Sequence, residues 1–127
     1  MLYIITTDKS IDTVRNEMEF KAKELGFGVL KEYKFQNILK SKGYPIDKDI
    51  TVFELCNPIA AQTVLSSHPE VSVYLPCRIS LYLDNGKTTL STIGLDDMLH
   101  NFNLEDELKA HMKAIFDKLK TLLGSWE

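Results

Sequence analysis

Two cysteines are the residues of this chain with the best-defined chemistry. Cys56 lies in the stretch FELCNPIAA, directly before Asn57 and Pro58, and Cys77 follows Pro76. Asparagine is a good residue for capping a helix, and proline is tolerated at the first helical position because its missing N–H costs nothing there. We therefore expect a helix to begin at Pro58, with the sulfur of Cys56 close to its free N–H groups.

The position of Cys56 supports two interpretations. The positive end of a helix favours a thiolate over a thiol, which would make Cys56 reactive. Alternatively, Cys56 packs as a small hydrophobic side chain where the preceding strand enters the core, as free cysteines often do. Glu54 lies on the same strand face, and a neighbouring carboxylate raises the pKa of a thiol. We therefore assign no catalytic residue and consider an enzyme less expected than a binding protein.

Cys77 lies on the apolar face of a predicted strand, which favours packing. If its sulfur meets that of Cys56 at one end of the sheet, the pair could form a redox dithiol or a soft-metal site. A structural zinc site needs four ligands, and His68 and His111 are expected at the far end of one helix and on the flank of another. We therefore predict no metal ligands and no cofactor.

The candidate ligand-binding residues are Cys56, Asn57, Cys77 and Arg78. Arg78 shares a strand face with Tyr82, opposite the apolar face, where it could contribute to an anion or partner site. The predicted ligand is accordingly a small thiol, a sulfur compound or an anion.

Hydrophobic periodicity predicts the elements that position these residues. Apolar or alternating runs predict strands at 2–6, 27–35, 50–55, 75–84 and 87–93, the first of them buried. Apolar residues at spacings of three and four predict helices at 11–25, 58–67 and 104–123, with short helical turns near 38–39 and 95–102. Ser10, Asn57 and Asn103 are expected to cap the three longer helices.

The order of these elements predicts an α+β fold. Asn85-Gly86 between two strand-like runs indicates a tight hairpin with a primed turn, so the sheet should be mainly antiparallel. Cys77, Ile79, Leu81 and Leu83 should face the core, and the helices should pack on one face of the sheet. The length of 127 residues fits a single domain spanning 1–127.

Composition excludes several classes of protein. The net charge is −3, and positive and negative residues are interleaved, which indicates no nucleic-acid partner. No apolar run approaches the length that spans a bilayer, and the N-terminus lacks the pattern of a signal peptide. We therefore predict a cytoplasmic protein that does not bind membranes and keeps both cysteines as free thiols.

Four stretches, in order along the chain, carry a resemblance to a known family. GFGVLKEY, ELCNPIAA, YLPCRISLYLDNGK and TIGLDDML resemble the domain of unknown function 302 family, over about residues 7–122. The resemblance implies a two-layer sandwich similar to the TATA-binding-protein architecture and a homodimer, but a shared fold is no warrant for DNA binding. The chain departs from the expected pattern at Gly94-Leu95-Asp96, where we expect a proline.

Two functions follow from these observations. The first is a small cytoplasmic binding module with a cysteine-based ligand, sulfur or redox site. The alternative is a structural or interaction protein that acts through a homodimer or partner surface, with both cysteines in the core.

Overall fold

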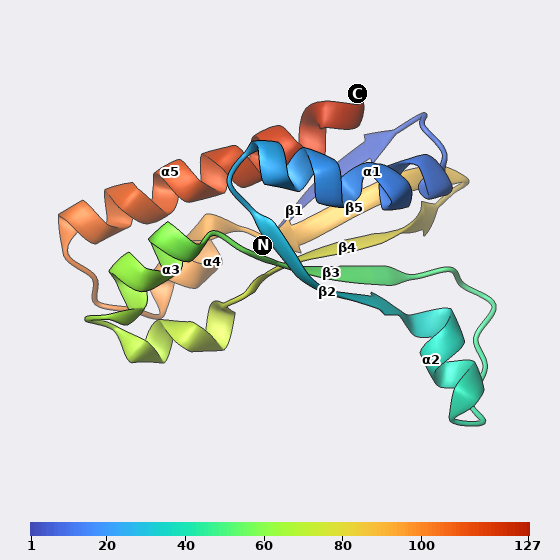
Figure 1. Ribbon diagram of the computed structural model, residues 1–127, viewed down its shortest axis with the longest axis horizontal. Coiled ribbons are helices and arrows are strands. Elements are labelled where there is room, and N and C mark those ends of the chain that lie inside the picture. Colours follow the sequence, from blue (N-terminus) through green and yellow to red (C-terminus); the bar gives the residue numbers. More distant parts are fainter.

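The computed structural model describes residues 1–127 and shows an α+β fold built on one five-stranded sheet (Figure 1). The strand order is β1-β5-β4-β3-β2, and every neighbouring pair is antiparallel. The predicted fold class and antiparallel sheet are confirmed. The strands are β1 (Leu2–Thr7), β2 (Gly28–Lys34), β3 (Thr51–Cys56), β4 (Cys77–Asp84) and β5 (Lys87–Ile93).

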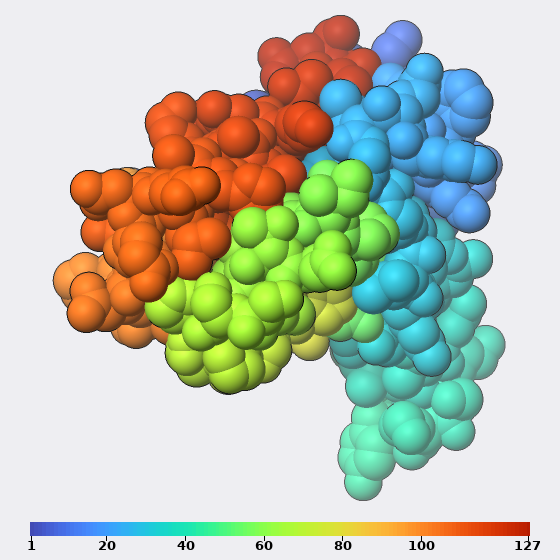
Figure 2. Space-filling model, turned by 60° about the vertical axis from the view of Figure 1, so that its left-hand side comes forward, coloured from blue at the N-terminus to red at the C-terminus, as the bar shows by residue number.

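The helices fall into three groups. Figure 1 shows α1 (Ile11–Glu24) and α5 (Asp106–Leu123) lying over one face of the sheet, as predicted. The short helices α3 (Pro58–Leu65) and α4 (Leu95–His100) and the 3₁₀ helix η1 (Pro69–Tyr74) gather beyond one end of the strands. In contrast, α2 (Phe35–Ser41) projects from the body of the molecule (Figure 2). A second 3₁₀ helix, η2 (Gly124–Trp126), follows α5.

Local signals explain several boundaries. The Ser10 hydroxyl accepts a hydrogen bond from the Thr13 amide at 3.1 Å and caps α1. The β4–β5 hairpin turns at Asn85 and Gly86, which have φ values of 51° and 78°. Two positive φ angles in succession are the signature of the predicted primed turn.

Three predictions about burial and capping are wrong. β1 is an edge strand with one face open, so Leu2 and Ile4 are 56% and 52% exposed. Leu83 is 51% exposed because it lies next to the hairpin turn. Asn103 does not cap α5, which begins at Asp106. Leu104 is buried, and the chain keeps an irregular course there before the helix begins.

The apolar side chains form two separate clusters. The main cluster joins the covered face of the sheet to α1 and to the C-terminal half of α5, and includes Phe53 and Leu81. The second cluster lies at the end of the sheet and contains Val64, Val71, Met98, Leu104 and Met112. The space between the two clusters is where a cavity lies.

Candidate functional site: an apolar cavity at the end of the sheet

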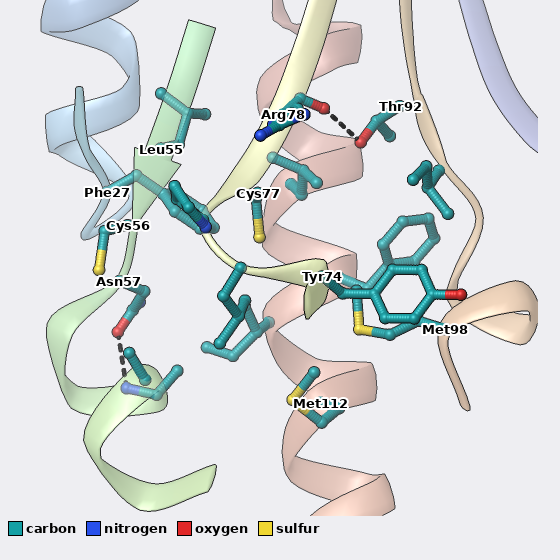
Figure 3. A pocket seen from close by; sticks show the side chains of 18 of the residues that line it. Phe27, Leu55, Cys56, Asn57, Tyr74, Cys77, Arg78, Thr92, Met98 and Met112 are labelled. Carbon is teal, nitrogen blue, oxygen red and sulfur yellow. Dashed lines mark hydrogen bonds between the residues drawn. The ribbon is translucent and has the colours of Figure 1, made fainter. Parts of the chain in front are cut away.

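A cavity of about 180 Å³ lies where β3, β4 and β5 meet α3, α4, α5 and η1. Of the 20 residues that line it, 16 are hydrophobic. Figure 3 shows side chains from these elements around it, with Cys77, Met98 and Met112 among them. A space that is lined by so few polar groups suits an apolar ligand better than an ion.

The helix α5 accounts for the position of the cavity. Its C-terminal residues Leu119 and Leu122 belong to the main cluster, whereas Met112 belongs to the second. One straight helix thus spans both clusters, and the cavity is lined along it by Met112, Ile115, Phe116 and Leu119. The small residues Ala60 and Ala61 of α3 also line this space.

Cys77 contributes a protonated thiol to the cavity wall. Burial, and after it the charge of Cys56, raise the pKa of this thiol to about 11, while a backbone hydrogen bond acts in the opposite direction. Because a thiol, unlike a thiolate, is a poor nucleophile, Cys77 is unreactive at neutral pH.

The two cysteines are free and lie at the same end of the sheet, as the sequence suggested. However, Cys77 is paired with Leu55 across β3 and β4, so Cys56 belongs to the opposite face of the sheet. In Figure 3 the two side chains do not point toward each other. The two thiols are therefore not arranged as a dithiol pair.

Asn57 has a complete structural explanation. Its Oδ1 accepts a hydrogen bond from the Ala60 amide at 3.0 Å, which caps α3, and Pro58 occupies the first turn, as predicted (Figure 3). Its amide nitrogen packs over Gly26, whose φ of +86° ends α1, and a Cβ at Gly26 would lie 3.3 Å from that nitrogen. Asn57 thus caps α3 and lies against the turn at Gly26.

Arg78 lies on the uncovered face of the sheet. Its Nε is 3.4 Å from Oε2 of Glu54, and the Tyr33 hydroxyl donates to Oε1 of the same carboxylate at 2.7 Å. This hydrogen bond is the main cause that raises the pKa of Tyr33. The backbone carbonyl of Arg78 accepts from Thr92 (Figure 3). Arg78 and Glu54 thus form an ion pair on the sheet face to which Cys56 also belongs, and all four predicted site residues are among those that line the cavity.

Sequence reasoning missed the aromatic and methionine side chains of the cavity. Tyr74 ends η1, packs edge-on against Phe102 at 5.5 Å, and accepts a hydrogen bond from Asn101 at 2.8 Å. The signal available was the apolar run VSVYL between a helix and a strand. No group of three or more His, Cys, Asp or Glu side chains is arranged to hold a metal ion, and no helix is long and apolar enough to cross a membrane.

Comparison with known proteins identifies the family. The family described as "Domain of unknown function DUF302" matches residues 3–125. No curated protein matches the chain. A solved structure, the "uncharacterized conserved protein DUF302 from Bacillus stearothermophilus", is 25% identical, with 99% of this chain and 98% of that chain covered and a TM-score of 0.89. The chain therefore belongs to the DUF302 family.

Proposed function

We propose that this protein is a binding module that takes up a small, uncharged and mainly apolar molecule in the cavity at the end of the sheet. The observation that carries the proposal is the cavity of about 180 Å³ between two otherwise packed clusters. An engineered cavity of about 150 Å³ in another protein stays dry and binds benzene or xenon. A ligand of that size class fits here.

The energetic cost of an unfilled cavity supports this function. A closed apolar cavity costs about 24 cal/mol per Å³, so roughly 4 kcal/mol is the upper limit for a space of this volume that is partly open to the surface. Domains of this size have a net stability of only about 5–15 kcal/mol. A ligand that fills the space would recover part of that loss, which gives the bound state a physical driving force.

Cys77 acts in this function as a binding group and not as a reactive thiol. With the pKa of Cys77 at about 11, roughly one molecule in ten thousand carries the thiolate at neutral pH. Thiol exchange needs that thiolate, so the raised pKa argues against redox or sulfur-transfer chemistry at Cys77. Its neutral S–H remains a weak donor toward a bound ligand, and a reducing compartment such as the cytoplasm would keep it free.

Fluorobenzene, observed by ¹⁹F NMR, tests the proposal. The wild-type protein should bind it, whereas Ala61→Leu should abolish binding because the added atoms occupy the cavity. Ala114→Leu is the matched control, since Ala114 is an exposed residue of α5 that does not line the cavity. Absence of binding to the wild type, or equal binding to both variants, would refute the proposed function.

A second candidate function is self-association at the β1 edge of the sheet. Leu2, Ile4 and Ile93 are 56%, 52% and 42% exposed there, and Leu2 is directly paired with Ile93. These residues form an apolar stripe on and beside β1, which pairs with no strand on its outer side. Such an edge is open to another strand unless it is protected.

A second copy of the chain is the partner that this edge fits. Antiparallel pairing of β1 with itself around Ile4 would satisfy the free backbone groups of both copies by one twofold axis. Sedimentation velocity should then show a dimer that Ile4→Lys dissociates, while Phe20→Lys, on exposed helix surface, leaves it intact. A monomeric wild type, or a dimer that survives Ile4→Lys, would exclude this interface.

A further inference from the structure

His68 lies between two carboxylates from different parts of the chain. Its Nδ1 is 3.1 Å from Oε1 of Glu70, and its Nε2 is 3.0 Å from Oε2 of Glu105. His68 immediately precedes η1, Glu70 is in the first turn of η1, and Glu105 immediately precedes α5. We call these three residues the His68 clamp.

The clamp requires a proton on both ring nitrogens. An ionised carboxylate only accepts hydrogen bonds, and a neutral imidazole has a single N–H to donate. With a carboxylate oxygen at each nitrogen, only the imidazolium satisfies both contacts. The pKa of His68 is accordingly raised above its ordinary 6.5, first by the hydrogen bond to Glu105, with Glu70 adding to it and desolvation opposing it.

The clamp connects two segments that lie next to the cavity. It joins the corner between α3 and η1 to the start of α5, and between these points lie Val71, Leu104 and other residues of the second cluster. Tyr74, Leu75 and Pro76, which follow in the same segment, line the cavity directly. A ligand that enters or leaves through this wall must displace the segment 69–76, which the clamp holds at its beginning.

We propose that the protonated His68 clamp keeps the segment 69–76 closed over the cavity, and that loss of the proton lets this segment open more often. This inference rests on the proposed function, because it assigns a pH-dependent gate to the same cavity. No charged group other than Glu70 on η1 and Glu105 before α5 influences His68.

The direction of the pH dependence follows from the two shifted groups. The pKa of His68 is raised, so the stabilisation that its proton provides is complete below pH 6.5. This stabilisation is lost as the pH rises through the higher pKa that His68 has in the folded protein. The pKa of Glu105 is lowered from 4.5, mainly by a hydrogen bond from its own backbone amide and then by His68, so its stabilisation is lost only in acid. The clamp is therefore strongest between these limits.

Exchange of fluorobenzene measures the gate. In the wild type, the dissociation rate should rise about threefold between about pH 5.5 and pH 8.5, the size expected for a partly exposed ionic contact. Glu105→Gln should remove this rise, because an amide can donate to or accept from a neutral imidazole. Glu107→Gln, an exposed carboxylate of the first turn of α5 without a partner in the clamp, should retain it.

A ligand-free readout separates the gate from the binding function. The amides of Val71 and Leu75 donate to His68 and Ser72 at 3.0 and 3.2 Å, and their hydrogen-exchange protection should fall between the same two pH values in the wild type but not in Glu105→Gln. If fluorobenzene does not bind but protection falls as described, the binding function is wrong and the clamp stands. Protection or dissociation that is independent of pH in the wild type, or unchanged by Glu105→Gln, would overturn the gate.

Discussion

The two apolar clusters differ in how fully they are packed. The main cluster joins the sheet to α1 and α5, and most of its side chains, such as Leu81 and Leu90, have no exposed surface. The second cluster is smaller, includes residues that are slightly exposed, such as Met98, and borders a cavity. The main cluster also reaches the cavity, through Phe27, Leu55 and Leu119, so the two clusters differ in size and in burial and not in access to the cavity.

The two clusters also differ in the polar groups that close them. At the main cluster, Thr7 donates to the carbonyl of Trp126, and the indole N–H of Trp126 donates to Glu17, so η2 is held by two hydrogen bonds that involve no histidine. At the second cluster, the closing contacts run through His68. Only the second closure contains a histidine, the side chain whose ordinary pKa lies closest to neutral pH.

The largest effect on stability should come from the main cluster. Leu81 has no exposed surface and lies in β4 between β3 and β5. Leu81→Ala should lower the free energy of unfolding by about 4 kcal/mol, because a close-packed site cannot collapse around the lost atoms. Urea denaturation measures this change, and a loss as small as that at Met98 would contradict the difference between the clusters.

The rate at which the Cys77 thiol reacts should show whether water reaches the side of the cavity that Cys77 lines. In a Cys56→Ser variant, Cys77 is the remaining thiol, and its pKa of about 11 should slow its reaction with iodoacetamide at pH 7 by about a hundredfold relative to a free cysteine. Mass spectrometry over time gives the rate. Reaction as fast as that of a free thiol would mean that water reaches this wall.

A truncation in the second cluster should cost less than one in the main cluster. Met98 already borders empty space, so Met98→Ala removes fewer contacts and should lower the free energy of unfolding by about 2 kcal/mol. It should also enlarge the cavity and strengthen the binding of probes larger than fluorobenzene. Unfolding and ¹⁹F titrations on one sample test both effects, and unchanged preference among probes would contradict the proposed lining.

The smallest of these effects should come from the helix cap. Asn57→Ala removes the hydrogen bond to the Ala60 amide and should cost about 1 kcal/mol. Because the side chain is engaged in capping, the variant should bind fluorobenzene as the wild type does. Asn57→Asp, which retains the cap, is the control, and loss of binding in both variants would give Asn57 a direct role toward the ligand.

Sequence could predict what is determined locally. Asn57-Pro58 and Asn85-Gly86 set a helix start and a hairpin within a few residues, so both appear in the structure as predicted. The alternation in β4 likewise identified Ile79 and Leu81 as core residues. These features depend on backbone geometry and short-range hydrogen bonds, which neighbouring residues in the chain define.

The cavity could not be predicted in the same way. It is formed by side chains from Phe27 to Leu119, and an empty space between two clusters leaves no pattern in any one stretch. The N-terminus of α5 shows the same limit, since the helix begins at Asp106, three residues after the capping residue Asn103 that the local sequence favours, and Leu104 is buried in the second cluster. The sequence suggested that the two cysteines lie at the same end of the sheet, and they do. That they belong to opposite faces could be seen only from the strand register.

Crystals of the protein equilibrated with xenon under pressure would show whether the cavity takes up an apolar guest. Xenon enters apolar cavities of this size, and we expect an anomalous peak beside Cys77, Met98 and Met112. The Ala61→Leu variant should lack this peak. A wild-type crystal in which the two clusters close against each other, with no xenon between them, would refute the proposed apolar binding site.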